Sequence, residues 1–331
     1  MLLAGDLGAT KTTLALYTDE QSLTAPVAEA TFSSAHYPSL AAIIGEFLQQ
    51  QPGPIAVASL GVAGPIIGDE AHVTNLHWRV NTTTLAAELG IPTVYLLNDL
   101  AAIANALAIL QPADLHTLNM GKPFAGSNMA VIAPGTGLGE AFLVWDGVRY
   151  RPYPSEGGHA DFAPTNDWEM GLWQYMRAGL GFDHVSYEAV CSGLGIPHIY
   201  EYVKASGFAD EPDWLAAALA TAPDPTPVIV NAALDERKPC AICAATLDTF
   251  ISILGAEAGN LALKVLATGG VYLGGGIPLH ILPKLSAGPF LQAFCHKGRF
   301  EEILNVVPVH VIRNPQAALL GAANYGFAQM Q

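Results

Sequence analysis

The stretch Thr93-Val-Tyr-Leu-Leu-Asn98-Asp99-Leu-Ala-Ala-Ile-Ala-Asn105-Ala-Leu-Ala-Ile-Leu110 decides the fold of this chain. Residues 93–97 are rich in β-forming side chains, and a helix-forming run of Ala, Leu and Ile follows Asn98 and Asp99. The pattern predicts a strand that leads directly into a helix. Open α/β sheets bind ligands at this carboxyl end of their strands. We therefore expect Asn98 and Asp99 to lie at a ligand-binding edge.

Asn98 and Asp99 suit two roles at this junction. Asn and Asp are common helix N-caps, so either side chain could simply bind free backbone N–H groups. Those N–H groups and the helix dipole also favour a negative charge, so we expect an ionised Asp99 near neutral pH. An ionised carboxylate can accept a proton from a substrate. The stretch by itself leaves capping and catalysis open.

The composition limits the classes of protein to consider. A length of 331 residues suggests about two domains. The chain is 51% apolar, yet it has no uninterrupted apolar segment of ~18 residues, so we expect no membrane span. The net charge of −15 argues against nucleic acid as a partner. The first residues show no secretory signal, and four cysteines do not form a disulfide framework, so we expect a cytoplasmic location.

The opening segment, residues 2–17, is typical of a strand, a small-residue turn and a second strand. Backbone N–H groups and the Thr10 hydroxyl could contact a polyphosphate, and Asp6 could hold Mg²⁺ directly or through water. An ordinary hairpin turn is the alternative. The segment is not a Walker A loop, which requires GxxxxGK[ST]. The candidate phosphate-binding residues here are Gly5, Asp6, Leu7, Gly8, Ala9 and Thr10.

The same strand–turn–strand pattern recurs at residues 129–145, with Gly135, Thr136 and Gly137 at the turn. The recurrence predicts two similar domains, each with a phosphate-facing hairpin. A strand follows these glycines instead of a helix, which excludes a Rossmann fingerprint. Later, Gly275 and Gly276 follow a predicted strand. Glycines there let the backbone lie flat against a base or ribose, although close helix–strand packing would also explain them.

Three polar residues in the second half of the chain suit sugar hydroxyls. Glu156 and His159 flank two glycines, and the carboxylate and imidazole could bind hydroxyls of one ligand. A polar surface loop is the alternative. Glu188 is expected just inside a helix, where a first-turn acidic residue complements the helix dipole.

The turn-rich segment 112–127 is the expected crossover between two domains, because it lacks strong periodicity. A further strand is expected near residues 148–150. The helices expected outside the opening stretch cover residues 38–50, 82–89, 167–177, 243–266 and 317–327.

Taken together, these motifs resemble the bacterial glucokinase family, and the resemblance covers nearly the whole chain. Each motif is weak alone, but their common order is specific. In order they are Gly5-Asp6-Leu7-Gly8-x-Thr10, Asn98-Asp99, Gly135-Thr136-Gly137-Leu138-Gly139, Ser155-Glu156-Gly157-Gly158-His159, Ser186-x-Glu188, Ser192-Gly193-x-Gly195, Gly274-Gly275-Gly276-Ile277, Lys297-Gly298-Arg299-Phe300, Asn314-Pro315 and Leu319-Leu320-Gly321. The cysteine-rich zinc motif of the related repressor/ORF/kinase family is missing.

The resemblance implies an α/β fold with two ribonuclease-H-like domains of the actin/hexokinase type around a central cleft. It implies a small domain of residues 1–110 completed by 314–331, and a large domain of residues 111–313. The implied reaction transfers the γ-phosphoryl group of Mg·ATP to the 6-hydroxyl of glucose, with Asp99 as general base. The implied sugar-binding residues are Asn98, Asp99, Glu156, His159 and Glu188. The implied nucleotide-binding residues are Asp6, Gly8, Thr10, Gly135, Thr136, Gly137, Gly275 and Gly276.

Two departures and three alternatives remain. Ala9 and Lys11 replace residues that the family usually has as Gly and Asn, which bears on the preferred phosphoryl donor. A kinase for another hexose, such as mannose or fructose, is one alternative, and a non-catalytic sugar-binding regulator is a second. A third, an acetate-kinase type, is disfavoured because Glu156, His159 and Glu188 would have no polyol to bind. The chain is compatible with a homodimer.

Overall fold

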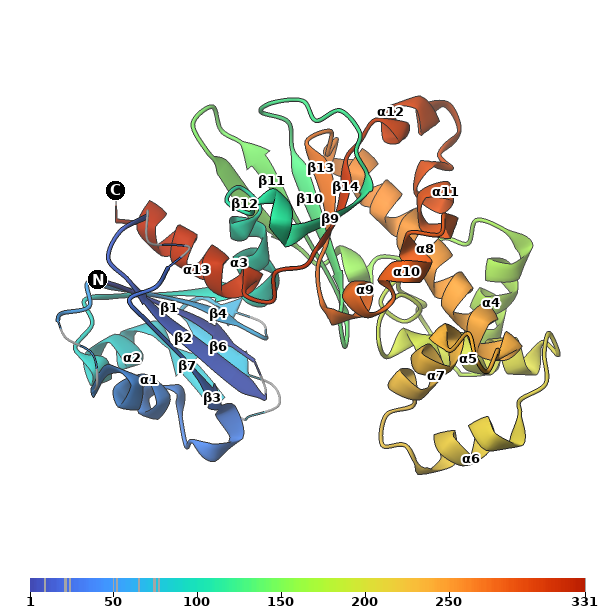
Figure 1. Ribbon diagram of the computed structural model, residues 1–331, viewed down its shortest axis with the longest axis horizontal. Coiled ribbons are helices and arrows are strands. Elements are labelled where there is room, and N and C mark those ends of the chain that lie inside the picture. The colour runs from blue at the N-terminus through green and yellow to red at the C-terminus, as the bar shows by residue number, and fades with distance from the viewer. Residues whose placement is uncertain are drawn as a thin grey trace. The chain divides into compact units, whose positions relative to one another are not determined.

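The computed structural model describes residues 1–8, 10–20, 23, 25–49, 51, 53–64, 66–73, 76 and 78–330, and they form two compact units (Figure 1). Unit 1 consists of Met1–Asp114, Val148–Pro154 and Asn314–Gln331. Unit 2 consists of Leu115–Gly147 and Ser155–Arg313. The chain therefore leaves unit 1 twice and returns with its last residues.

The main sheet of unit 1 has the strand order β3-β2-β1-β4-β8. The first three strands are antiparallel, whereas β4 and β8 run parallel to β1. The carboxyl ends of β1, β4 and β8 therefore lie at one edge of the sheet, where ligands bind in α/β sheets. The strands of unit 1 are β1 (Leu2–Leu7), β2 (Lys11–Tyr17), β3 (Ala28–Ser33), β4 (Val57–Val62), β5 (Ile66–Ile67), β6 (Glu70–Val73), β7 (Trp78–Asn81) and β8 (Thr93–Asn98).

Helices enclose the core of unit 1. Helix α1 buries Leu40, Ile43, Ile44 and Phe47, whose spacing places them on one face. Helix α13, from the end of the chain, packs with Leu2 and other residues of the sheet. The helices of unit 1 are η2 (Ser34–His36), α1 (Leu40–Gln49), α2 (Thr82–Leu89), α3 (Asp99–Ala106), η3 (Pro112–Asp114) and α13 (Ala317–Ala328).

The sheet of unit 2 repeats this pattern: β11, β10, β13, β14 and β9 follow one another in a six-stranded sheet that begins with β12. Strands β10 and β11 form an antiparallel hairpin, and β13 and β14 run parallel to β10. The repeated pattern confirms the predicted α/β class with two similar units. The strands that follow β8 along the chain are β9 (Leu115–Asn119), β10 (Met129–Pro134), β11 (Leu138–Trp145), β12 (Tyr150–Ser155), β13 (Gly270–Leu273) and β14 (Val309–Ile312).

Helix α8 is the central helix of unit 2. By length and composition it could cross a membrane, but 72% of its most apolar window is buried inside the protein. Its buried side chains belong to the core of unit 2. The helices of unit 2 are η4 (Gly157–His159), α4 (Asp167–Ala178), α5 (Gly195–Ala205), α6 (Asp213–Thr221), α7 (Pro225–Leu234), α8 (Ala241–Val265), α9 (Gly276–His280), α10 (Leu282–Leu285), α11 (Pro289–Cys295), η5 (Gly298–Phe300) and α12 (Glu301–Asn305).

The structure departs from the sequence prediction at four places. Strand β9 lies inside the expected turn-rich crossover, where its pairing with β14 supplies the order that local periodicity lacks. Strand β12 begins at Tyr150 and does not cover 148–150 as expected. Helix α3 ends at Ala106, before Leu110. Glu188 lies in a turn that precedes α5 and is not inside a helix.

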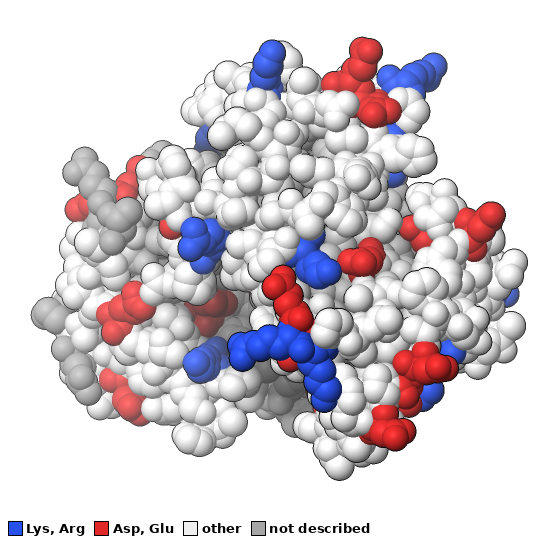
Figure 2. All heavy atoms as spheres, turned by 45° about the vertical axis from the view of Figure 1, so that its right-hand side comes forward, with Lys and Arg blue, Asp and Glu red and all other residues white. Residues whose placement is uncertain are grey.

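Charged side chains are sparse on the molecular surface. On the face drawn in Figure 2, Lys and Arg stand singly or in small groups among Asp and Glu, and most of the surface is neither. This distribution agrees with a charged fraction of only 13%.

Candidate active site

Asn98 and Asp99 lie at the junction of β8 and α3, as the sequence predicts. Asn98 is the N-cap of α3: its Oδ1 accepts a hydrogen bond from the backbone N–H of Ala101 at 2.7 Å. Asp99 Oδ1 accepts one from the N–H of Leu100 at 2.9 Å. Asn98 is therefore the residue that caps the helix, while the Asp99 carboxyl lies at its first residue, where it can also bind a ligand.

The pKa of Asp99 is raised above its ordinary value. Desolvation by the surrounding protein is the largest cause, even though the residue as a whole is exposed. The hydrogen bond from Leu100 lowers the pKa, as expected at a helix amino terminus, but by less. A raised pKa makes Asp99 a stronger base than an ordinary aspartate.

Asp6 lies at the same sheet edge as Asp99. In the parallel strands β1, β4 and β8, Leu7 pairs with Val62, and Val62 pairs with Asn98. Burial and, to a smaller extent, the nearby carboxylate of Asp99 together raise the pKa of Asp6 to about 6. Unit 1 therefore brings two carboxyl groups together at the edge where ligands bind.

The predicted phosphate turn of unit 1 follows Asp6. Gly8 N–H donates to the carbonyl of Lys11 at 2.9 Å, and Ser34 contacts the turn through its hydroxyl and its N–H. Thr10 is exposed, whereas Gly5 and Leu7 face the core. Ala9 lies outside the described residues.

A cavity of about 230 Å³ lies beside this turn. Asp6 and the exposed Lys11 are both among the residues that line it. The full lining is Asp6, Lys11, Thr13, Glu29, Thr31, Pro315, Gln316 and Leu319. A carboxylate that can hold a cation beside a lysine suits a metal-bound polyphosphate.

The predicted sugar residues of unit 2 come together. Glu188 N–H donates to the carbonyl of Gly158 at 2.8 Å, which joins the Glu188 turn to the Glu156–His159 loop. His159 Nδ1 lies 3.9 Å from Glu188 Oε1. Glu156 and His159 are exposed, and Glu188 is half-buried, so all three can reach a ligand.

The two glycines of this loop lie flush against β11. A Cβ at Gly157 would overlap Oε2 of Glu140, and a Cβ at Gly158 would overlap the carbonyl oxygen of Leu138. Close approach to the strand, and not left-handed backbone, is therefore the reason for glycine at both positions.

The Glu188 carboxylate also supports the predicted phosphate turn of unit 2. Its Oε2 accepts a hydrogen bond from Leu138 N–H at 3.0 Å, and a Cβ at Gly137 would overlap it. This tertiary contact accounts for the position of Glu188 in a turn, where the sequence had predicted the first turn of a helix. One side chain thus links the sugar-type residues to the glycine turn.

The nucleotide-type glycines of unit 2 gather at the carboxyl ends of β10 and β13. Gly193 N–H donates to the carbonyl of Gly135 at 2.7 Å, and a Cβ at Gly275 would lie 2.7 Å from the carbonyl oxygen of Pro134. A Cβ at Gly135 or Gly276 would meet nothing within 4 Å. Open space therefore lies beside both glycines. Thr136 completes this turn, and its carbonyl accepts from Leu194 N–H at 3.3 Å.

Sequence reasoning assigned no role to three residues near the predicted site, which are Gly193, Glu140 and Glu257. Gly193 supports the glycine turn. Glu140 and Glu257 are 1% and 0% exposed, respectively. In the sequence, Glu140 and Glu257 could have been recognised as single acidic residues inside an otherwise apolar strand or helix. Such a residue is almost never fully buried without a partner.

Within the described residues, no group of three or more His, Cys, Asp and Glu side chains is placed to hold a metal ion. The Asp6 carboxyl lies near that of Asp99 in a largely desolvated position, and a bound cation would balance their negative charge. Mg²⁺ commonly binds one or two carboxylates and completes its shell with water and phosphate oxygens. Asp6 therefore fits the predicted Mg²⁺.

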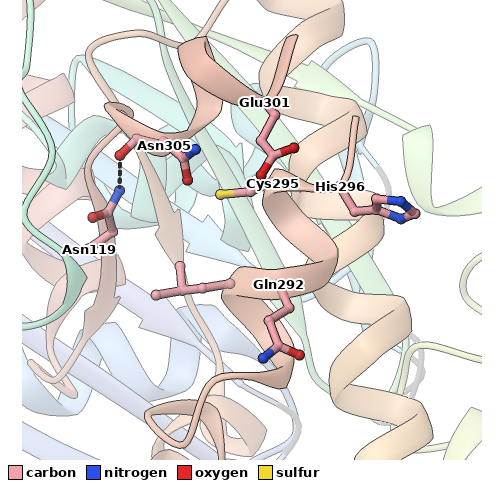
Figure 3. A pocket seen from close by; sticks show the side chains of 7 residues that line it. Asn119, Gln292, Cys295, His296, Glu301 and Asn305 are labelled. Atoms are coloured by element: carbon pink, nitrogen blue, oxygen red, sulfur yellow. Dashed lines mark hydrogen bonds between the residues drawn. The ribbon is translucent and has the colours of Figure 1, made fainter. Parts of the chain in front are cut away.

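A second cavity, of about 490 Å³, lies in unit 2 between α11, α12 and β9 (Figure 3). Its polar lining includes Gln292, His296 and Glu301, and Asn119 Nδ2 donates across it to the carbonyl of Asn305 at 3.0 Å. The residues that line it include none of the predicted site residues. We assign it no part in the predicted site.

Comparison with known proteins gives one consistent result. The family model described as Glucokinase matches residues 3–329. A glucokinase of Nostoc punctiforme is 42% identical, with 98% of each chain covered. A glucokinase of Synechocystis sp. is 36% identical, with 97% of this chain and 96% of the relative covered.

Solved structures show the same likeness. The crystal structure of a glucokinase from an Antarctic psychrotroph superposes with a TM-score of 0.85 at 32% identity, covering 99% of this chain and 98% of that chain. The structure of a glucokinase from Balamuthia mandrillaris in complex with glucose has a TM-score of 0.77 at 21% identity, covering 99% and 93%, and supports the fold alone.

Proposed function

This chain belongs to the glucokinase family, and on that premise we propose that it transfers the γ-phosphoryl group of ATP to the 6-hydroxyl of glucose. The products are glucose 6-phosphate and ADP. The observation that carries the proposal is the pairing of Asp99 with Asp6 at the ligand-binding edge of unit 1. One carboxylate can accept the proton of a hydroxyl while the other holds a cation.

Asp99 acts as the general base. Its carboxylate takes the proton of the 6-hydroxyl as the oxygen attacks the γ-phosphorus, and the bond from that phosphorus to the ADP oxygen breaks. General-base assistance contributes about 10²- to 10⁴-fold in rate. The desolvation that raises the pKa of Asp99 supports this role.

The two glycine turns and Asp6 bind the nucleotide. Asp6 would hold Mg²⁺, which supplies positive charge to the phosphate oxygens when bound. Lys11 adds a positive charge in the same cavity. Gly135, Thr136 and Gly137 bind phosphates through backbone N–H groups, and the open space beside Gly276 takes the adenosine.

The remaining polar residues bind the sugar. Asn98 binds a hydroxyl beside the reacting one, while Glu156, His159 and Glu188 bind the others. The support is the 3.9 Å approach of His159 to Glu188 and the exposure of Glu156. A polyol suits this combination of acceptors and one imidazole.

A panel of sugars in an ADP-release assay tests the substrate. Glucose should give the highest kcat/KM among glucose, mannose and fructose. Equal or better turnover of mannose or fructose would instead establish the kinase for another hexose.

Asp99→Asn tests the base and separates a kinase from a non-catalytic sugar-binding regulator. We expect kcat to fall at least ~10²-fold while glucose still binds, because the amide keeps the hydrogen-bonding shape but accepts no proton. Unchanged turnover would refute the base assignment. Glucose binding without turnover in the unaltered protein would indicate the regulator.

The proposal extends to the setting of the enzyme. Units 1 and 2 correspond to the small and large domains of the family. We infer a cytoplasmic location without membrane or nucleic-acid partners, as the charge of −15 suggests, and a homodimer is the assembly to test by light scattering.

A further inference from the structure

Two buried carboxyl groups of unit 2 interact with each other, and one of them contacts the sugar loop. Glu140, on β11, is 1% exposed, and Glu257, on α8, is 0% exposed. The Glu140 carboxyl also touches the loop itself, because a Cβ at Gly157 would overlap its Oε2. These groups have no part in the proposed reaction, yet a movement of the Glu140 carboxyl toward the loop would displace Gly157.

The two carboxylates differ in their hydrogen bonds. Glu257 Oε2 accepts from Asn260 Nδ2 at 2.8 Å, and its Oε1 accepts from Lys264 Nζ at 3.2 Å. Glu140 Oε1 has no hydrogen-bond partner among the residues that the structure describes. A buried ionised carboxylate without donors is costly. Glu257 is therefore suited to be ionised, and Glu140 is not.

We propose that Glu140 carries a proton that it donates to Glu257, and that this protonated pair holds the Glu156–His159 loop in the geometry that binds glucose. Glu140 is then a positioning residue: it acts through Gly157 and the loop, not on the sugar. The inference rests on the proposed binding of glucose by this loop.

The charge count of the pair supports one shared proton. With Glu140 protonated, Glu257 and Lys264 form a neutral pair, whereas two ionised carboxylates would leave a net negative charge in a buried place. Burial, followed by the charge of Glu257, raises the pKa of Glu140 to about 8. The proton is therefore present at pH 7 and is lost as the pH rises through about 8.

The other titratable groups around the pair lie on three further segments. Tyr187 and Cys191 have raised pKa values, first through burial and then through Glu257, so both stay neutral. Lys297 donates to Asn260 Oδ1 at 2.7 Å, and burial lowers its pKa. Glu169, on α4, acts on Lys297. Lys297 is thus a competing explanation for a change in this pH range, and a Glu140 variant separates the two.

Loss of the proton has a defined effect. The ionised Glu140 would repel Glu257 and would have to move, and its Oε2 lies against Gly157. Gly158 in turn binds Glu188 through the backbone. Glucose binding should weaken above pH 8, while nucleotide binding and the kcat of bound sugar change little.

The experiment measures the Kd of glucose by calorimetry and its KM and kcat in turnover, from pH 7 to pH 9.5. This window lies above the range in which histidine and carboxyl side chains ordinarily titrate. If only the protonated form binds, Kd and KM should rise up to about tenfold between pH 7 and pH 9, with kcat nearly constant. In Glu140→Gln, which keeps a donor at every pH, both should stay flat.

Glu169→Gln is the matched control. Glu169 is also 1% exposed, but its Oε2 accepts from the N–H and the hydroxyl of Thr165, so it has the donors that Glu140 lacks. This variant should keep the pH dependence of the unaltered protein. A flat Kd in the unaltered protein, or the same rise in Glu140→Gln, overturns the proposal.

An infrared spectrum of the glucose-free protein tests directly whether Glu140 is protonated, with no measurement of activity. The C=O stretch of a protonated carboxylic acid should be present at pH 7, disappear with a midpoint near pH 8, and be missing in Glu140→Gln. If Glu140→Gln does not fold, the band and its midpoint in the unaltered protein decide. A protein with this band but no glucose turnover would disprove the proposed function alone, and a protein without the band would disprove the shared proton alone.

Discussion

Asp6 shows how one residue can trade stability for function. Its carboxyl is crowded by protein and by Asp99, so its ionised form is disfavoured in the folded chain without ligand. The same arrangement favours the binding of a cation, because a nearby positive charge stabilises the ionised form of both carboxyl groups. The site is therefore least stable when empty and ionised.

Asp6→Asn should remove this penalty. Between pH 3.8 and about 6 the folded state holds more protons than the unfolded state, so the free energy of unfolding falls as the pH rises. At pH 7 the variant should be more stable than the unaltered protein by about 1–3 kcal/mol, and the difference should vanish near pH 4. Urea unfolding of the nucleotide-free protein at both pH values measures it.

Asp69→Asn is the control for this prediction, since Asp69 is exposed in a turn of the same unit. It should leave the pH dependence unchanged. A gain for Asp6→Asn that is equal at pH 4 and pH 7 would mean that the amide acts through packing and not through charge.

At the scale of elements, unit 1 contains two helices that are capped in the same way. Asn98 Oδ1 accepts from Ala101 N–H at 2.7 Å at the start of α3, and Asn81 Oδ1 accepts from Thr84 N–H at 3.1 Å at the start of α2. Only the first is proposed to contact sugar. The pair therefore separates the cost of losing a cap from the cost of losing a ligand contact.

Asn98→Ala and Asn81→Ala should each lower the free energy of unfolding by about 0.5–2 kcal/mol, the usual cost of an Asn N-cap. Only Asn98→Ala should also raise the glucose KM, by ~10-fold, because a hydrogen bond to substrate is commonly worth about 1.5 kcal/mol. Denaturant unfolding and steady-state kinetics on both variants check this. A similar rise in KM for Asn81→Ala would show that the effect comes from destabilisation.

The elements also show what a sequence can predict. Helix α2 was predicted as 82–89 and has those bounds, because its cap at Asn81 and its left-handed Gly90 lie in the helix's own sequence. Strand β9 was missed because it forms by pairing with β14, about 190 residues away in the sequence. Thr117 of β9 is hydrogen-bonded to His310 of β14. Local sequence signals predict the bounds of an element whose capping residues lie next to it in the sequence. They do not predict an element that forms only by pairing with a distant strand.

The same distinction applies to the candidate site: some of its features were predicted, and others depend on tertiary contacts. The family resemblance implied that Glu156, His159 and Glu188 bind one sugar, and the structure places these residues close together in unit 2. The sequence did not predict the setting of Glu188, whose carboxylate takes a backbone N–H from Leu138. Nor did it predict the raised pKa of Asp99, because desolvation depends on what packs around the carboxyl.

At the scale of the molecule, unit 1 is assembled from three separate segments. Helix α13 packs closely on α3, where a Cβ at Gly321 would overlap the carbonyl oxygen of Ala102. It also covers Leu2 and Tyr17 of the sheet, which are 0% and 1% exposed. Unit 1 therefore lacks one side of its core until this helix is present.

A chain that ends at Arg313 should lose the fold of unit 1 but keep that of unit 2, whose segments it retains. Hydrogen exchange should show β1 and β2 unprotected while α8 stays protected. A chain that ends at Ala328, the last residue of α13, is the control and should match the full protein. Protection of β1 without residues 314–331 would contradict this account.

The late arrival of α13 has a consequence for synthesis on the ribosome. About 200 residues separate Asp114 from Asn314, and at roughly 5–20 residues per second their translation takes on the order of 10–40 s. The first 114 residues must wait through that interval with an uncovered apolar sheet face. We therefore expect the nascent amino-terminal segment to be the part of this enzyme that depends on a chaperone.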